Sequence, residues 1–252
     1  VEDSHSRRLK TACNNLVDEA GDITTNSPKV RKARKTILEL ILANHPQDCL
    51  HCEKNGKCEL QTLAAEYNIR GNIFDPVWKP VPKEMSNPAL VRDMVKCVRC
   101  GRCVEACQAV QTTNAIGYSG RSTDFKITTA FEKPLDESPC VYCGQCVAAC
   151  PVGALYEKDD TQRVWDAIDD PDKFVIVQTA PAVRVAIGEE FGMARGSIAT
   201  GKMVAALRRL GFNKVFDTDF AADLTIMEEG YELLDRMKNG GVLPMITSCS
   251  PG

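Results

Sequence analysis

The sequence predicts two kinds of fold along one chain: small cysteine-rich α+β modules, followed by the start of an α/β domain with a parallel sheet. Two observations support this division. Twelve of the 13 cysteines among the 252 residues come before residue 151. After residue 170, short apolar segments alternate with segments of helical periodicity, which is typical of strands and helices in a covered parallel sheet.

Composition narrows the classes of function. Apolar residues make up 44% of the chain, and 31 basic and 34 acidic residues give a net charge of −3. This balance is typical of a soluble globular protein and does not favour nucleic acid as a partner. No run approaches the roughly 18 apolar residues that a membrane helix needs. The opening VEDSHSRRLK lacks the apolar stretch of a signal peptide. We therefore expect a cytoplasmic protein with no membrane span.

The sequence predicts two helices between residues 28 and 67. Ser27 and Pro28 are a preferred cap and a preferred first helical residue. Pro46 disfavours helical geometry at the residue before it, so we expect a helix over residues 28–44. A second, short helix is expected over residues 59–67.

The spacing C-x2-C-x2-C-x3-C occurs twice, at residues 97–107 and 140–150. Disulfide frameworks do not usually repeat in this way, and the odd cysteine count also argues against one. Three closely spaced thiolates wrap around a 4Fe–4S cubane, and in two-cluster ferredoxins the fourth cysteine of each run binds the other cluster. We therefore assign one cubane to Cys97, Cys100, Cys103 and Cys150, and a second to Cys140, Cys143, Cys146 and Cys107.

These two cubanes would pass single electrons. Zinc held by four thiolates is the alternative. Pro151 follows Cys150 as the pattern expects, whereas Gln108 stands where the other proline would be. Between the two runs, we expect an inserted hairpin or pair of loops over residues 116–131.

A third candidate site has the spacing H-x3-C-x2-C-x5-C and consists of His45, Cys49, Cys52 and Cys58. The neighbouring repeat favours a third 4Fe–4S cluster here, with structural zinc as the alternative. A neutral imidazole in place of one thiolate should raise the potential of such a cluster. His51 is not expected to be a ligand, because binding so close to Cys49 would strain the loop.

The last third of the chain predicts alternating strands and helices. We expect strands at residues 174–178, 214–216 and 243–247, and helices at residues 183–191, 202–210 and 222–238. The last of these strands would deliver Cys249 to its carboxyl end, where open α/β sheets usually bind ligands.

Several of these segments resemble a known family. HPQDCLHCEKNGKCELQ is similar to the His-ligated cluster segment shared by iron-only (FeFe) hydrogenases and the large iron–sulfur subunit of complex I. VQTAPAVRVAIGEEFG, TGKMVAALRRLGFNKVFDTDFAADLTIMEEG and PMITSCSPG resemble the start of the FeFe-hydrogenase catalytic domain. The resemblance covers essentially the whole chain.

The resemblance implies four parts. Residues 1–27 would end a 2Fe–2S ferredoxin-like domain, in which Cys13 matches the last ligand; a lone buried thiol is the alternative for Cys13. Residues 28–90 would form the His-ligated 4Fe–4S domain, and residues 91–170 the ferredoxin-like domain with two 4Fe–4S clusters. Residues 171–252 would form the N-terminal part of the catalytic domain, whose H-cluster site is incomplete in this chain.

The family also implies catalytic residues. Its first H-cluster motif carries a Cys-Cys doublet, whereas this chain has Cys249 and Ser250, so Cys249 falls on the proton-relay position and serine on the ligand position. A serine alkoxide is a harder ligand than a thiolate, so two alternatives stay open: Cys249 takes the ligand role, or the motif varies within a subfamily. Glu229, Glu232 and Arg236 fall on relay positions leading toward Cys249, and their spacing places them on one helix face. An ordinary surface Glu–Arg pair is the alternative.

We expect the electron-relay and partial catalytic portion of a hydrogenase that interconverts H2 with protons and electrons. By resemblance, its partners would be flavin- and NAD(P)-binding diaphorase subunits, a small 2Fe–2S subunit, and ferredoxin as a further electron partner. The alternative is a non-catalytic electron-wiring subunit of a formate dehydrogenase or a complex I-like diaphorase.

Overall fold

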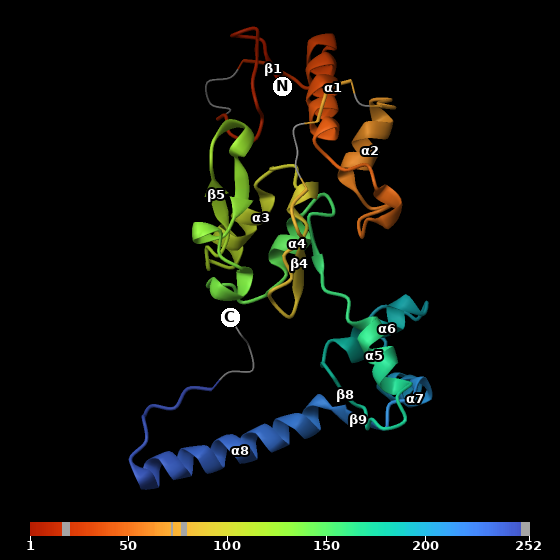
Figure 1. Ribbon diagram of the computed structural model, residues 1–252, viewed down its shortest axis with the longest axis vertical. Coiled ribbons are helices and arrows are strands. Elements are labelled where there is room, and N and C mark those ends of the chain that lie inside the picture. Colours follow the sequence, from red (N-terminus) through yellow and green to blue (C-terminus); the bar gives the residue numbers. More distant parts are fainter. Residues whose placement is uncertain (17–20, 72, 77–79, 248–252) are drawn as a thin grey trace. The chain divides into compact units, whose positions relative to one another are not determined.

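The computed structural model describes residues 1–252 except 17–20, 72, 77–79 and 248–252 (Figure 1). The chain forms two compact units, Val1–Lys158 and Asp159–Pro251. The four-part division expected from the sequence remains a prediction. None of the described helices is both long enough and apolar enough to cross a membrane.

The first unit begins with a small antiparallel sheet, followed by the two expected helices. Its elements are β1 (Glu2–Asp3), β2 (Arg8–Leu9), β3 (Ile23–Thr24), α1 (Pro28–Ala43), the 3-10 turn η1 (Cys49–His51) and α2 (Glu59–Glu66). Ser27 caps α1 as predicted, because its Oγ accepts a hydrogen bond from the Val30 N–H at 3.2 Å. The loop from His45 to Cys58, here named the His45 loop, connects α1 to α2.

A second part of this unit, the dicluster module of residues 90–157, is closed by β4 pairing antiparallel with β7. Its elements are β4 (Leu90–Arg92), η2 (Met94–Lys96), α3 (Arg102–Glu105), the π-turn η3 (Ala106–Val110), β5 (Gly117–Ser119), η4 (Ser122–Asp124), β6 (Lys126–Thr128), η5 (Ala130–Glu132), η6 (Leu135–Glu137), α4 (Gln145–Ala149) and β7 (Leu155–Glu157). The expected hairpin is confirmed, because β5 and β6 pair antiparallel.

One hydrophobic core runs through the first unit. It joins Leu38 of α1 and Leu60 of α2 to Val104, Val147 and Val152 of the dicluster module. Burying each such aliphatic side chain stabilises the fold by about 1.5–3 kcal/mol. The core therefore fixes the His45 loop on the dicluster module.

The second unit alternates helices and strands. Its elements are α5 (Thr161–Ile168), β8 (Ile176–Thr179), α6 (Val183–Glu190), α7 (Thr200–Leu210), β9 (Lys214–Asp217) and the long helix α8 (Thr218–Asn239), drawn in blue in Figure 1. β8 and β9 pair in parallel, with Ile176 opposite Lys214. Gly240 ends α8 in the left-handed conformation that glycine adopts readily.

The third expected strand, at residues 243–247, is not a strand in the structure. Pro244 has no N–H to donate to a neighbouring strand. Val242 and Ile246 are 79% and 88% exposed, so no packing draws this segment into the pair formed by β8 and β9. The apolar run was therefore insufficient evidence for a strand.

Candidate functional site

The eight cysteines of the two repeats line one cavity in the dicluster module. The cavity has a free volume of about 50 Å³. Apolar side chains such as Leu90, Ile116 and Val152 form most of the remaining wall. The thiols that line it are Cys97, Cys100, Cys103, Cys107, Cys140, Cys143, Cys146 and Cys150. Their convergence suits soft-metal clusters, because thiolates are the usual ligands of iron–sulfur centres.

The two cysteine loops repeat the same backbone geometry. Gly101 and Gly144 have φ values of +79° and +77° and precede α3 and α4. The Arg99 N–H donates to Cys97 Sγ, and the Tyr142 N–H donates to Cys140 Sγ, each at 3.4 Å. Backbone donors that point at cysteine sulfurs stabilise negative charge there and help to set the potential of a bound cluster.

Burial opposes ionisation of the free thiols. It raises the pKa of Cys103 to about 12 and the pKa of Cys146 to about 11. These side chains become thiolates when a metal supplies the opposing positive charge. The donor set therefore fits a cationic iron–sulfur core better than it fits free thiolates.

Interactions among the thiols follow the interleaved assignment. Burial is the main cause of the raised pKa of both Cys97 and Cys140. The neighbouring thiol that raises the pKa of Cys97 most is Cys150, from the other repeat. For Cys140, it is Cys107, again from the other repeat. This grouping supports two cubanes that exchange their fourth ligands.

The fourth cysteines of the two repeats, Cys107 and Cys150, differ in local backbone conformation. Cys150 ends α4 in an extended conformation, and Pro151 follows it. Cys107 lies within the π-turn η3, where Gln108 lets the backbone continue helically. Cys107 Sγ also lies 3.4 Å from Thr113 Oγ1, whereas Cys150 Sγ donates to the Val152 carbonyl at 3.1 Å. The departure from proline thus changes the local backbone while Cys107 still reaches the cavity.

The arrangement of the ligands favours clusters over zinc. Zinc requires its thiolates to converge at about 2.3 Å from one point. A cubane spreads four ligands over four iron atoms. Eight thiols around one cavity therefore match the ligand arrangement of two cubanes better than that of zinc.

The third candidate site lies in the His45 loop. Cys49 begins η1, Cys52 follows it, and Cys58 is the cap residue of α2. His45 Nδ1 is buried and has no hydrogen-bond partner, as expected of a nitrogen whose natural partner is a metal. Burial lowers the pKa of His45, and the nearby Lys96 charge lowers it further, so the imidazole is in its neutral, metal-binding form. His51 is exposed.

The His45 loop packs directly on the dicluster module. A Cβ added to Gly153 would lie under 3.0 Å from Cys52 Sγ, so a larger residue at position 153 would require this sulfur to move. Gly153 follows Cys150 by three residues. The Glu59 N–H donates to the Pro151 carbonyl at 3.1 Å. The third site and the cubane assigned to Cys150 are thus neighbours.

Two buried cations at these sites were not identified from the sequence. Lys96 is 5% exposed, and its Nζ lies 3.5 Å from Asp93 Oδ2 and 3.7 Å from Asp48 Oδ2. Arg92 is 6% exposed and lines the cavity of the eight thiols. Lys96 could have been noted from its position next to Cys97, whereas no local sequence signal marks Arg92 as buried.

Three family models match separate parts of the chain. Residues 34–72 match the NADH-ubiquinone oxidoreductase-G iron-sulfur binding region. Residues 96–154 match a 4Fe-4S dicluster domain, and residues 173–252 match the C-terminal domain of the iron only hydrogenase large subunit. These matches identify the chain as a 4Fe–4S protein.

Two relatives extend the similarity over the whole chain. The chain is 48% identical over 258 residues to the NADP-reducing hydrogenase subunit HndD of Solidesulfovibrio fructosivorans, covering 100% of the chain and 44% of that protein. It is 42% identical over 245 residues to iron hydrogenase 1 of Clostridium pasteurianum, covering 97% of the chain and 43% of that protein. The chain is thus similar along nearly its whole length to an NADP-reducing hydrogenase subunit and to an iron hydrogenase. It spans less than half the length of these two relatives.

A solved structure is also similar. The NAD+-reducing NiFe-hydrogenase in its H2-reduced state matches with a TM-score of 0.56 and 28% identity, covering 62% of this chain and 66% of that chain. The alternative of a formate dehydrogenase or diaphorase wiring subunit is not favoured, because residues 173–252 match the iron-only hydrogenase C-terminal domain.

The remaining residues that the iron-only hydrogenase resemblance implied have mixed outcomes. Glu229, Glu232 and Arg236 lie on α8, and Arg236 Nε donates to Glu232 Oε1 at 2.9 Å. Cys13 is exposed, which contradicts the alternative of a buried thiol. Cys249 lies outside the described residues.

Proposed function

We propose that this chain carries three 4Fe–4S clusters as the electron relay of an iron-only hydrogenase and begins its catalytic domain. The observation that carries the proposal is the cavity into which both repeats bring all eight thiols. The proposed ligands of the third cluster are His45, Cys49, Cys52 and Cys58. When bound, these clusters supply one-electron chemistry.

The structure supports an order for the relay. Cys52 lies against Gly153, near Cys150, so the His-ligated cluster would exchange electrons first with the cubane assigned to Cys97, Cys100, Cys103 and Cys150. That cubane would share its cavity with the second one. The apolar wall excludes water and holds the ligands at fixed positions, which limits the rearrangement that accompanies each electron transfer.

The C-terminal part would contribute to H2 chemistry. Glu229, Glu232 and Arg236 supply titratable and charged groups on α8, and the hydrogen bond from Arg236 orients the Glu232 carboxylate. Proton relays use such groups within hydrogen-bond reach of each other. Cys249 would be the next relay residue of the H-cluster site.

The proposal includes partners and a further cluster. One relative is an NADP-reducing hydrogenase subunit, which supports flavin- and NAD(P)-binding diaphorase subunits and a small 2Fe–2S subunit as partners. Ferredoxin is a further proposed electron partner. Cys13 would be the last ligand of a 2Fe–2S cluster, and its exposed position leaves it accessible to the rest of such a site. Because cysteines that bind iron must stay reduced, the proposed location is the reducing cytoplasm.

The test uses full-length protein, prepared anaerobically with its maturation factors. We expect H2 to reduce the 4Fe–4S clusters, seen by EPR, and we expect infrared bands from CO and cyanide on a diiron unit. The same sample under argon is the control. Clusters that dithionite reduces but H2 leaves oxidised, without the infrared bands, would contradict the hydrogenase assignment and leave an electron-wiring subunit.

A further inference from the structure

A buried lysine side chain connects the dicluster module to the His45 loop. Lys96 ends η2 and directly precedes Cys97, a proposed ligand of the first cubane. Its side chain is buried, so its charge is withdrawn from water. A buried charge is costly unless other groups hold it, so a structural reason for its retention is expected.

The ammonium group of Lys96 reaches the His45 loop. Its Nζ lies 3.7 Å from Oδ2 of Asp48, the residue that precedes the proposed ligand Cys49. Its stem passes a second ligand, because the same Cβ on Gly153 that would meet Cys52 Sγ would lie 3.7 Å from Lys96 Cδ. The sulfur and this carbon are therefore within about 7 Å of each other, a range over which a buried charge acts strongly. Two separate contacts thus place the positive charge beside the third site.

The backbone of η2 fixes where this side chain begins. The Asp93 N–H donates to the Ala154 carbonyl at 2.8 Å, and the Lys96 N–H donates to the Asp93 carbonyl at 3.0 Å. The buried Asp93 carboxylate also lies 3.5 Å from Lys96 Nζ through its Oδ2. Lys96 is therefore held at both ends, by its own turn and by the loop that it reaches.

Four charged side chains alternate in sign along this contact. Lys83 Nζ lies 3.9 Å from Asp93 Oδ2, so the row runs from Lys83 through Asp93 and Lys96 to Asp48. Lys83 and Asp48 at its two ends are about half exposed, and water screens their charges. All three contacts are longer than the roughly 2.7–2.9 Å of a tight charge-assisted hydrogen bond. The cation at the His45 loop is thus positioned without being tightly neutralised.

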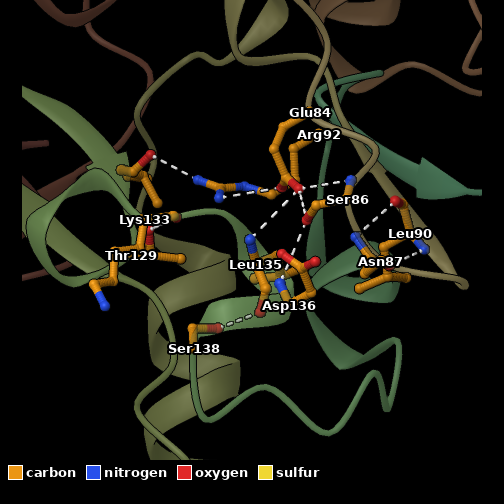
Figure 2. A network of polar contacts seen from close by, with 11 residues as sticks. Glu84, Ser86, Asn87, Leu90, Arg92, Thr129, Lys133, Leu135, Asp136 and Ser138 are labelled. Atoms are coloured by element: carbon orange, nitrogen blue, oxygen red, sulfur yellow. Dashed lines mark hydrogen bonds and ion pairs between the residues drawn. The ribbon is translucent and has the colours of Figure 1, made fainter.

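Other cations are less suited to act on the third site. Arg92, the other buried cation among the described residues, lines the cavity of the eight thiols and contacts Glu84 and the Ile127 carbonyl (Figure 2). Lys54 borders Gly153 through its Cβ at 3.6 Å but is only half-buried, so solvent screens it more than it screens Lys96. Lys96 is therefore the buried cation that the distances place at the His45 loop.

We propose that the fixed charge of Lys96 raises the reduction potential of the His-ligated cluster, and that Asp48 limits this rise. The inference rests on the proposed function. When the His-ligated cluster takes one electron from the neighbouring cubane, that cubane is oxidised by one. A fixed cation in a region of low dielectric stabilises the added negative charge. The neutral imidazole of His45 acts in the same direction, so the two residues together favour the reduced form of this cluster.

The experiment is a potentiometric titration of the anaerobically prepared full-length holoprotein, followed by EPR. The signal that disappears in Cys52→Ala identifies the His-ligated cluster. Lys96→Met removes the charge and keeps an unbranched stem, while Lys83 remains as the counter-ion of Asp93. We expect at least a tenfold loss of the reduced His-ligated cluster at a fixed potential, equivalent to a shift of about −59 mV for one electron. Lys96→Arg keeps the charge and should stay close to wild type.

Two further variants separate the position of the charge from a disturbance of the fold. Lys83→Met removes a cation from the same carboxylate at a half-exposed position, so the midpoint of the His-ligated cluster should move much less. Asp48→Asn removes the negative partner and leaves Lys96 in place, so the same midpoint should rise. A general disturbance of the His45 loop would instead move the midpoints of Lys96→Met and Asp48→Asn in the same direction.

Each outcome decides the inference. With full cluster content, it is overturned by an unchanged midpoint in Lys96→Met, by an equal shift in Lys83→Met, or by shifts of the same sign in Lys96→Met and Asp48→Asn. If Lys96→Met loses its clusters, Asp48→Asn alone decides, and any result other than a rise overturns the inference. Wild-type protein that lacks iron and sulfide would instead refute the proposed function itself.

Discussion

Replacing Gly153 by alanine separates cluster binding in the His45 loop from folding. The new Cβ would lie under 3.0 Å from Cys52 Sγ, whereas carbon atoms in contact are usually about 3.5–4.0 Å apart. The sulfur must then move by at least about 0.5 Å, which exceeds the roughly 0.2 Å tolerance of a metal–ligand bond. Gly153 has no left-handed φ, so the backbone itself accepts alanine.

A free thiol and a ligand respond differently to this clash. A free Cys52 thiol relieves it by rotating about χ1, at a cost of about 1 kcal/mol. A thiolate bound to iron cannot rotate without losing its bond, so the overpacking cost of about 1–3 kcal/mol falls on cluster binding. We therefore expect Gly153→Ala to fold and to hold the His-ligated cluster roughly 5- to 150-fold less tightly.

The assay combines iron and sulfide analysis with EPR spin counting after exposure to a chelator. The variant should lose one cubane's share of iron and sulfide and one EPR signal, while the two signals of the dicluster module persist. Gly117→Ala is the matched control, because a Cβ at Gly117 meets nothing within 4 Å. Full retention of all clusters in Gly153→Ala would refute the assignment of Cys52 as a ligand.

Three further predictions concern separate parts of the chain. Asn87→Ala removes three hydrogen bonds to backbone groups near β4 from a 1% exposed side chain, and should lower the urea stability of the holoprotein by about 3 kcal/mol; a change below about 1 kcal/mol would contradict this. A double-mutant cycle on Glu59 and Arg102, both about half exposed, should give a coupling below about 1 kcal/mol despite their two short contacts, and a coupling twice as large would contradict it. Glu229→Gln should slow H2 turnover by roughly 100-fold without altering the EPR signals of the clusters. Glu228 is an exposed neighbour, so Glu228→Gln should leave the H2 turnover rate unchanged. Equal rates in the two variants would refute the proton relay.

Local signals predicted much of the first unit. Ser27 and Pro28 marked the start of α1, whose first residue is Pro28 in the structure. The cysteine spacing placed eight thiols around one cavity, because ligand loops of this kind encode their geometry over a few residues. The interleaved assignment required only the rule that the fourth cysteine crosses to the other cluster.

Long-range features were beyond local patterns. In the sequence, nothing distinguishes Arg92 from an ordinary strand residue. Its burial depends on Glu84 and on the carbonyl of Ile127, which lies 35 positions after Arg92. The close approach of Gly153 to Cys52 likewise joins residues about a hundred positions apart. The expected strand at residues 243–247 failed for a related reason: an apolar run becomes a strand only where another strand pairs with it.

The central claim is that two interlocked sets of thiolates hold iron–sulfur cubanes in one cavity. Its most direct test is metal and sulfide analysis of protein prepared without oxygen. The account predicts iron and inorganic sulfide in equal amounts, with EPR signals of reduced cubanes after dithionite is added. Stoichiometric zinc without inorganic sulfide would contradict it.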